Sequence, residues 1–181
     1  MIDRSLYPAR IVVVGCPGAG KTYFSAMLAR RIGIRHIERD RLGVPNTQAF
    51  RDDVSAAVAG ERWVFDGPPY FVEGLVYPAV QAVIWLDYQR SLILARAIRR
   101  SLRRMLGPLE PGQTCRYRLQ QWLAPGGPRF AMSVYTDRRR EFARLRQRPE
   151  LAGVAFIRFG SPNAAAAWLA TLDPRFNTSA H

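Results

Sequence analysis

A chain of 181 residues, 48% of them hydrophobic, is long enough to bury one core and short for two, so we expect one domain over 1–173 and a tail over 174–181. Its 27 basic residues against 14 acidic ones give a net charge of +13, which favours phosphate-rich partners, either nucleic acid or small phosphorylated molecules. The apolar stretches are short, so no membrane span is expected, and the polar N-terminus does not resemble a secretory signal. Two cysteines and two histidines are too few to predict a disulfide framework or a four-ligand metal site. We therefore expect a cytoplasmic protein.

Strand-like and helix-like segments alternate along the chain, a pattern typical of a parallel α/β sheet. Residues 11–14 form a continuous β-branched run, which predicts a strand buried on both faces. A helix is expected over 21–31 and ends near Gly33, a residue suited to a left-handed cap. A short strand over 34–38 and a second helix over 47–59 follow. The apolar face of that second helix carries Ala49, Phe50, Val54 and Val58.

The middle of the chain continues the alternation with two strands and a long basic helix. The strands are predicted over 63–65, leading into Asp66, and over 83–86, ending at Asp87. From 90 to 106 the period is helical, with an apolar stripe on one side and arginines on the other. The stripe consists of Leu94, Ile98, Leu102 and Met105.

The last part of the chain begins with a segment rich in Pro and Gly. This segment, 107–128, predicts a mobile excursion with a short helix near 115–123. A basic helix comes next, before a last strand over 154–159. Ser161 then supplies an N-cap, and Pro162 the first turn, for a final helix.

The segment between the first strand and the first helix has the spacing G-x-x-x-x-G-K-T. Glycine lets the backbone curl around phosphates, so that successive N–H groups and the start of a helix point at the anion. Lys21, the only lysine among the 27 basic residues, would reach the β- and γ-phosphates of ATP, and the Thr22 hydroxyl would coordinate Mg²⁺. Cys16 is interpreted as a space filler. The predicted nucleotide-binding residues are Gly15, Cys16, Pro17, Gly18, Ala19, Gly20, Lys21, Thr22 and Tyr23.

Three aspartates follow predicted strands, at the edge of a parallel sheet where ligands gather. Asp66 is the candidate to hold Mg²⁺ through its water ligands, and the alternative is a turn-forming Asp before Gly. Asp40 is a candidate to contact an acceptor group, or else a solvated turn residue. Asp87 is interpreted as a cap of the arginine-rich helix.

Arginines at spacings of three and four residues share one face of that helix. They are Arg96, Arg99, Arg100, Arg103 and Arg104, with no acidic residue between Asp87 and Glu110 to neutralise them. Arginine forks bind phosphate oxygens, so Arg96 and Arg100 are interpreted as a clamp on the transferring phosphoryl group. For Arg103 and Arg104 a clamp and a solvated basic face stay open. A second basic run begins at Arg138.

The series I-V-V-V-G-C-P-G-A-G-K-T, H-I-E-R-D, W-V-F-D-G and V-I-W-L-D, followed by the arginine helix, resembles the adenylate-kinase-like P-loop kinases. Within them the chain is most similar to the group described as DNA topology modulation proteins, over residues 10–172. The resemblance implies a P-loop NTPase three-layer α/β sandwich with five parallel strands in the order 2-3-1-4-5. It also implies a mobile lid over 107–128.

The resemblance assigns roles to individual residues. Asp66 matches the magnesium-site Asp, Arg96 an arginine near adenine, and Arg100 one near the phosphates. Arg138 lies where an arginine follows the lid, and Arg51 matches an acceptor-binding arginine. The chain departs from adenylate kinases in a shorter segment between Asp40 and Trp63 and in Pro-Pro-Tyr after Asp-Gly, where Phe-Pro-Arg is usual. These departures leave the acceptor open.

The leading hypothesis is an ATP- and Mg²⁺-dependent kinase for a small molecule or nucleotide, with Lys21, Arg96, Arg100, Arg138 and Asp40 as catalytic candidates. A phosphate acceptor needs no base, whereas a hydroxyl acceptor would be oriented or deprotonated by Asp40. The alternative is a nucleotide-dependent regulatory protein that binds nucleic acid through its arginine-rich helices without kinase turnover. A GTPase is disfavoured because its N-K-x-D motif needs a second lysine. The oligomeric state is not predicted.

Overall fold

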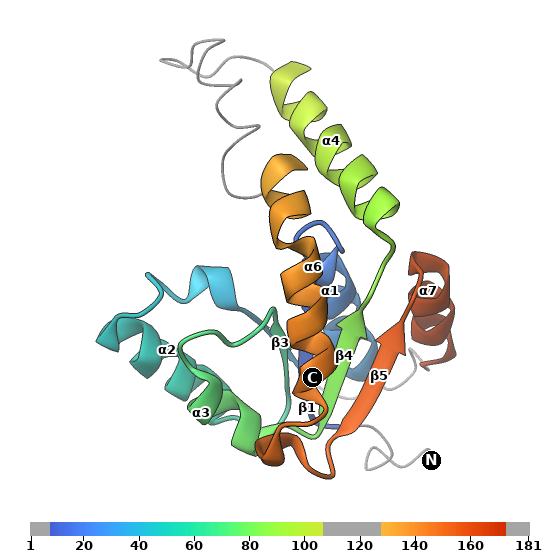
Figure 1. Ribbon diagram of the computed structural model, residues 1–181. Coiled ribbons are helices and arrows are strands. Elements are labelled where there is room, and N and C mark those ends of the chain that lie inside the picture. The colour runs from blue at the N-terminus through green and yellow to red at the C-terminus, as the bar shows by residue number, and fades with distance from the viewer. Residues whose placement is uncertain (1–7, 107–127, 173–181) are drawn as a thin grey trace.

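A computed structural model of the protein describes residues 8–106 and 128–172 (Figure 1). The predicted lid apart from Pro128, the short helix within it and the predicted tail lie outside the described residues. In the part of the chain that is described, no helix has the length and apolar character needed to cross a membrane.

The core of the fold is a five-stranded parallel sheet in the order β2-β3-β1-β4-β5. The strands are β1 (Arg10–Gly15), β2 (Arg35–Glu38), β3 (Trp63–Asp66), β4 (Ala82–Leu86) and β5 (Ala155–Phe159). In the register of the central strands, Val13 pairs with Asp66 on one side and with Ile84 on the other. The predicted fold class and strand order are confirmed, and the carboxyl ends of all five strands meet at one edge of the sheet.

Helices cover both faces of the sheet and make it the middle of three layers (Figure 1). Alternate residues of β1 enter opposite cores, since Ile11 and Val13 pack with α1 (Lys21–Ile32) and α7 (Pro162–Thr171). Val12 and Val14 pack with α2 (Gln48–Val58) and α3 (Glu73–Val76). A strand buried on both faces needs this continuous apolar run, which is what the sequence of β1 supplies.

Two long helices, α4 (Arg90–Leu106) and α6 (Pro128–Leu145), pack together and extend past the carboxyl edge of the sheet (Figure 1). The predicted apolar stripe of α4 is wrong by one residue. Its buried face carries Ile93, Ala97 and Ser101, while Leu102 is 42% exposed. Among the described side chains of α4, Ile93 and Ala97 in its first turns belong to the core.

Capping residues explain where several helices begin and end. Thr47 is the N-cap of α2 and accepts a hydrogen bond from the Phe50 amide, and Ser161 caps α7 in the same way. Gly33 ends α1 with a φ of 65°, as predicted. On α2, Ala57 is buried whereas the predicted Ala49 is exposed. Short helices that the sequence did not predict are α3, η2 (Arg39–Arg41), η3 (Tyr77–Ala79) and η4 (Pro149–Leu151).

Candidate functional site

The glycine-rich loop leaves β1 and turns directly into α1. A Cβ atom on Gly15 would lie 2.9 Å from the Leu86 carbonyl oxygen, so the close approach of the two strands excludes a side chain there. Gly18 and Gly20 have φ values of 92° and 87°, which L residues rarely adopt. Gly20 is also the N-cap of α1. The loop therefore presents the N-terminus of α1 to the space above the sheet edge, an arrangement that favours anions.

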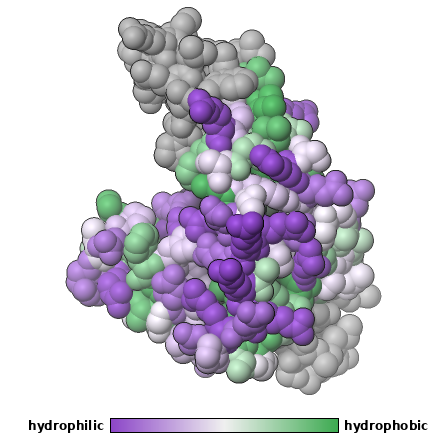
Figure 2. Space-filling model, viewed as in Figure 1, coloured by the Kyte–Doolittle hydropathy of each residue, from purple (hydrophilic) through white to green (hydrophobic). Residues whose placement is uncertain are grey.

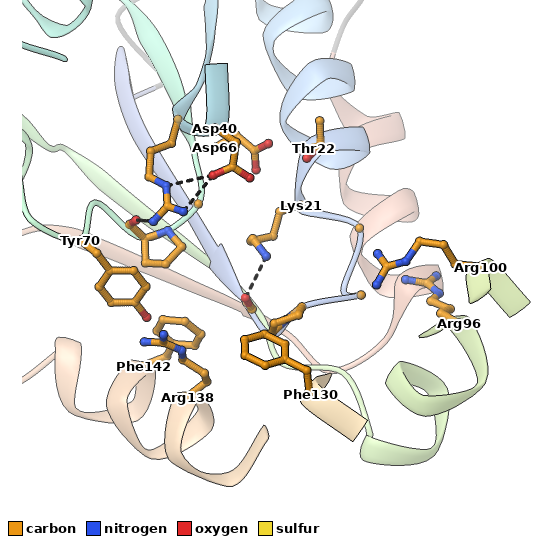
Figure 3. Close-up of a pocket in the computed structure, with 17 residues that line it drawn as sticks. Lys21, Thr22, Asp40, Asp66, Tyr70, Arg96, Arg100, Phe130, Arg138 and Phe142 are labelled. Atoms are coloured by element: carbon orange, nitrogen blue, oxygen red, sulfur yellow. Dashed lines mark hydrogen bonds and ion pairs between the residues drawn. The ribbon is translucent and has the colours of Figure 1, made fainter. Parts of the chain in front are cut away.

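The Lys21 side chain folds back over this loop. Its Nζ atom donates to the main-chain oxygen of Gly15 at 3.1 Å and to that of Cys16 at 3.4 Å (Figure 3). Burial lowers the pKa of the Lys21 ammonium, and the nearby Asp66 carboxylate opposes that shift. Both hydrogen-bond partners are neutral carbonyls, so within the described part of the chain the ammonium charge is held in place without a direct ion pair.

Asp66 ends β3, next to the strand that carries the loop. The residue is 9% exposed, and its Oδ1 atom is buried with no hydrogen-bond partner among the described residues. Burial raises the pKa of the Asp66 carboxyl, while the Thr22 hydroxyl and Lys21 lower it. A buried carboxylate oxygen without a partner, beside a hydroxyl, matches the hard oxygen ligands that Mg²⁺ prefers.

These groups open into a cavity of about 640 Å³ at the carboxyl edge of the sheet (Figure 3). We call one part the Arg96 side, made by Arg96 and Arg100 of α4 together with Lys21, Thr22 and the loop residues Gly15, Pro17, Gly18 and Gly20. We call the opposite part the Tyr70 side, made by Arg39, Asp40, Tyr70 and Arg138. The remaining lining residues are Asp66, Gly67, Pro68, Phe130 and Phe142.

The Arg96 side divides the predicted arginine stripe in two. Arg96 Nη1 donates to the Ala19 carbonyl at 2.9 Å, and its guanidinium carbon lies 5.5 Å from the centre of the Tyr88 ring. Arg100 also lines the cavity, whereas Arg99 and Arg103 are exposed. The side chain of Arg104 lies outside the described residues.

The Tyr70 side combines an aromatic residue from the segment between β3 and α3 with charged groups from η2 and α6. The Tyr70 hydroxyl donates to Glu141 Oε2 at 3.1 Å, and Arg138 Nη1 donates to the same oxygen at 2.8 Å. The Arg138 guanidinium carbon lies 4.3 Å from the centre of the Tyr70 ring. Burial is the main cause that raises the pKa of Tyr70, followed by the Glu141 charge, so Tyr70 is a neutral phenol at physiological pH.

A second ion pair lies on η2, where the chain leaves β2. Arg39 donates from Nη2 and Nε to Asp40 Oδ1, at 2.8 and 3.2 Å, and from Nη1 to the Pro68 carbonyl at 3.2 Å. The Asp40 side chain is 87% exposed, so its other oxygen is accessible at the rim of the cavity. The sequence-predicted Asp40 thus lines the cavity together with Lys21, Asp66, Arg96, Arg100 and Arg138.

Asp87 anchors α6 to the sheet, and its predicted role as a helix cap is wrong. Helix α4 begins at Arg90, two residues too late for Asp87 to occupy the cap position. The Asp87 side chain is 2% exposed and accepts from Arg139 at 2.8 and 3.1 Å and from Arg158 Nε at 2.9 Å. The Tyr135 hydroxyl donates a hydrogen bond to the Tyr88 carbonyl at 3.0 Å. These contacts fix α6, which carries Arg138, to the end of β4.

Three of the predicted nucleotide-binding residues do not line the cavity. The Cys16 thiol is buried and lies 3.8 Å from the Tyr135 carbonyl, and burial raises its pKa to about 11. Ala19 is buried, and the Tyr23 side chain is 73% exposed. Cys16 is therefore an unreactive packing residue, as interpreted from the sequence.

Several lining residues were not singled out from the sequence. They are Arg39, Pro68, Tyr70, Phe130 and Phe142. Tyr70 follows Asp66 by four residues, in the Pro-Pro-Tyr segment that departs from adenylate kinases, and that departure was the available signal. Phe130 and Phe142 are both on α6 and carried no local signal, since an aromatic residue on an amphipathic helix usually belongs to the core.

No protein-family model matches the chain, and no curated protein matches its sequence. Among solved structures it is similar to a deoxyadenosine kinase from M. mycoides with bound dCTP, at 13% identity and a TM-score of 0.50, over 89% of this chain and 96% of that one. A shikimate kinase from Acinetobacter baumannii in complex with shikimate matches at 16% identity and a TM-score of 0.47, over 90% of this chain and 89% of that one. A gluconokinase from Sinorhizobium meliloti 1021 matches at 18% identity and a TM-score of 0.43, over 97% of this chain and 99% of that one.

At these identities the shared property is the fold. The strand order and the likeness to the deoxyadenosine kinase agree on the three-layer sandwich of small P-loop kinases. The resemblance to DNA topology modulation proteins stays a prediction.

Proposed function

We propose that the protein is an ATP- and Mg²⁺-dependent phosphotransferase that acts on a small acceptor. The observation that carries the proposal is one convergence of groups: the glycine-rich loop, the Lys21 ammonium and the unpartnered Asp66 oxygen meet at the wall of a single cavity. A volume of about 640 Å³ leaves room for an acceptor beside a nucleotide.

The nucleotide would bind through its phosphates at the loop. The first N–H groups of α1 have no hydrogen-bond partners within the helix and would donate hydrogen bonds to phosphate oxygens. Lys21, whose present partners are neutral carbonyls, would add a positive charge at the β- and γ-phosphates. Arg96 and Arg100 approach the loop from α4, and a Cβ on Gly20 would lie 3.5 Å from Arg96 Nη1.

Thr22 and Asp66 would hold Mg²⁺. The fit rests on the buried Asp66 Oδ1 atom, a ligand oxygen that has no hydrogen bond among the described residues, and on the neighbouring Thr22 hydroxyl. When bound, Mg²⁺ would neutralise phosphate charge that grows during transfer. The residues of the chain then position the reactants, and phosphoryl transfer needs little more than positioning and charge stabilisation.

Steady-state ADP formation with varied Mg²⁺ tests this proposal. Thr22→Ala and Asp66→Asn should each lower Mg²⁺-dependent kcat by about a hundredfold with the fold retained in circular dichroism. Thr136→Ala and Asp53→Asn change the same groups at exposed positions of α6 and α2, and should behave as the unmodified protein. Turnover of Asp66→Asn at the unmodified rate would refute the metal assignment.

A second candidate is a nucleotide-dependent regulatory protein that binds nucleic acid without kinase turnover. It is favoured by exposed arginines, Arg99 and Arg103 on α4 and Arg140 and Arg144 on α6. Figure 2 shows hydrophilic side chains gathered over the face that α6 crosses. Salt-dependent duplex binding by a protein that turns over no acceptor would favour this candidate over a kinase.

A further inference from the structure

The two sides of the cavity differ in how their cations are neutralised. On the Tyr70 side each arginine has a carboxylate of its own, Arg39 with Asp40 at 2.8 Å and Arg138 with Glu141 at 2.8 Å. On the Arg96 side, the hydrogen bonds of Arg96 and of Lys21 go to neutral main-chain oxygens. Arg96 and Lys21 therefore offer positive charge to an anion, while the described Tyr70 side is already balanced.

From this balance we infer that the acceptor is an alcohol that carries no phosphate, rather than a nucleoside monophosphate, an inference that rests on the proposed function. A phosphate dianion on the Tyr70 side would meet arginines whose charge is already offset, Arg138 by Glu141 and Arg39 by Asp40. It would also lie close to these carboxylates, whose like charge repels it, most strongly at the partly buried Glu141. A hydroxyl group brings no charge, and the Asp40 carboxylate, which lines the cavity, can accept its hydrogen bond.

The aromatic ring on this side is also occupied by cations. The guanidinium carbons of Arg138 and Arg39 lie over the Tyr70 ring, 4.3 and 5.8 Å from its centre. The Tyr70 hydroxyl is committed to Glu141. Stacking a nucleobase on the ring would displace these guanidinium groups, so the Tyr70 side favours a polar, non-aromatic acceptor.

Asp40 is placed to receive the acceptor's proton. Arg39 holds Oδ1 with two N–H groups and thereby fixes the carboxylate, whose side chain is 87% exposed. In the transfer, the acceptor oxygen forms a bond to the γ-phosphorus of ATP. The bond from that phosphorus to the β,γ-bridging oxygen breaks, and ADP leaves with the electron pair. The acceptor's hydroxyl proton passes to Asp40 and then to water.

Asp40 can be tested with water, the smallest hydroxyl acceptor. Asp40→Asn should lower the kcat of ATP hydrolysis by about a hundredfold and leave the KM for MgATP unchanged. Asp52→Asn, an exposed carboxylate on α2, is the matched control and should hydrolyse ATP at the unmodified rate. An unchanged kcat in Asp40→Asn would overturn the assignment of a hydroxyl acceptor to Asp40.

Binding of nucleoside monophosphates tests the charge argument. The full chain is saturated with Mg²⁺ and AMP-PNP, and AMP, CMP, GMP and UMP are titrated in a calorimeter. We expect no binding of these monophosphates at millimolar concentration. Glu141→Gln removes the carboxylate charge beside Arg138, so AMP binding should become measurable at millimolar concentration. Asp137→Asn, exposed on the same helix and 4.0 Å from Arg140, should show no gain.

The outcomes separate this inference from the proposed function. Submillimolar binding or phosphorylation of a monophosphate by the loaded protein would overturn the inference and leave the phosphotransferase intact. The absence of AMP binding to Glu141→Gln at millimolar concentration would also overturn it. Failure of AMP-PNP to bind would instead overturn the proposed function, and the inference with it.

Discussion

The two sides of the cavity are built by different means. On the Arg96 side the main chain does most of the positioning, since glycines shape the loop and carbonyl oxygens hold Lys21 and Arg96. On the Tyr70 side paired side chains hold one another, and Glu141 accepts hydrogen bonds from both Tyr70 and Arg138. Main-chain geometry tolerates few substitutions, whereas side-chain pairs can be exchanged. Under the proposed function, the first side would bind the phosphate donor and the second would select the acceptor.

The largest expected effect comes from the cations of the Arg96 side. Replacing both Arg96 and Arg100 by Ala should lower kcat for ATP turnover by about a hundredfold or more, because charge developing on the transferring phosphoryl group loses two stabilising partners. Arg99 and Arg103 are exposed on the same helix, so the double replacement of these two is the matched control. It should mainly weaken any salt-sensitive polyanion binding. If replacing Arg96 and Arg100 changes duplex affinity and leaves kcat intact, the result would contradict the comparison of the two sides.

A smaller effect is expected when the loop's main chain is disturbed. Gly15→Ala puts a Cβ 2.9 Å from the Leu86 carbonyl oxygen, which either displaces the loop or destabilises the fold by about 1–3 kcal/mol. Affinity for MgATP should fall with it, by roughly tenfold. Gly60→Ala is the control, because nothing lies within 4 Å of the added atom. Equal urea midpoints and equal MgATP affinity for both variants would show that the loop is not tightly constrained.

The support of the Tyr70 side can be weakened through Asp87. Asp87→Asn removes a buried charge from Arg139 and Arg158, which are half exposed and can turn to water. We therefore expect a loss of only about 1–2 kcal/mol in the free energy of unfolding. Urea denaturation of Asp87→Asn beside Asp137→Asn measures it. A loss no larger than that of the control would mean that α6 is held by its apolar contacts alone.

The smallest effect concerns the stability of the protein without nucleotide. Burial raises the pKa of Asp66 in the folded state, so folding favours the protonated carboxyl. Ionised Asp66 therefore costs stability above its folded pKa, and this cost is lifted as the pH falls through that value. At neutral pH without Mg²⁺, Asp66→Asn should slightly raise the urea midpoint, and the gain should vanish at acidic pH. A lowered midpoint at neutral pH would contradict the assignment of a desolvated carboxylate whose Oδ1 atom has no hydrogen-bond partner among the described residues.

The loop of the Arg96 side was predictable from the sequence because its parts are local. The loop, its flanking strand and its helix are contiguous, and Lys21 and Thr22 are read from one motif. Arg96 lies 77 positions from its partner Ala19 and was singled out instead by the arginine spacing on its helix. The Tyr70 side depends on long-range contacts, such as the bond between Tyr70 and Glu141, which are 71 positions apart. No local pattern marks such a pair. The same limit explains Asp87, whose partner Arg139 is 52 positions away.

The error on α4 has a different physical cause. Leu94, Ile98 and Leu102 repeat every four residues, and so do the truly buried Ile93, Ala97 and Ser101. A helical period cannot distinguish two adjacent stripes, and larger apolar residues favoured the wrong one. Packing against α6 selects the stripe with small side chains, because these let the two helices approach closely.

Chemical modification of the solitary lysine tests the central claim, that the loop binds the phosphates of MgATP. An amine-selective reagent can modify only Lys21 and the chain's N-terminus, which serves as an internal control. Without nucleotide, the loss of activity should match the extent of labelling at Lys21, since neutralising the ammonium removes the charge that would lie at the β- and γ-phosphates. Saturating MgATP should slow labelling and inactivation together, and AMP should protect less. Equal labelling rates at Lys21 with and without saturating MgATP would contradict the account.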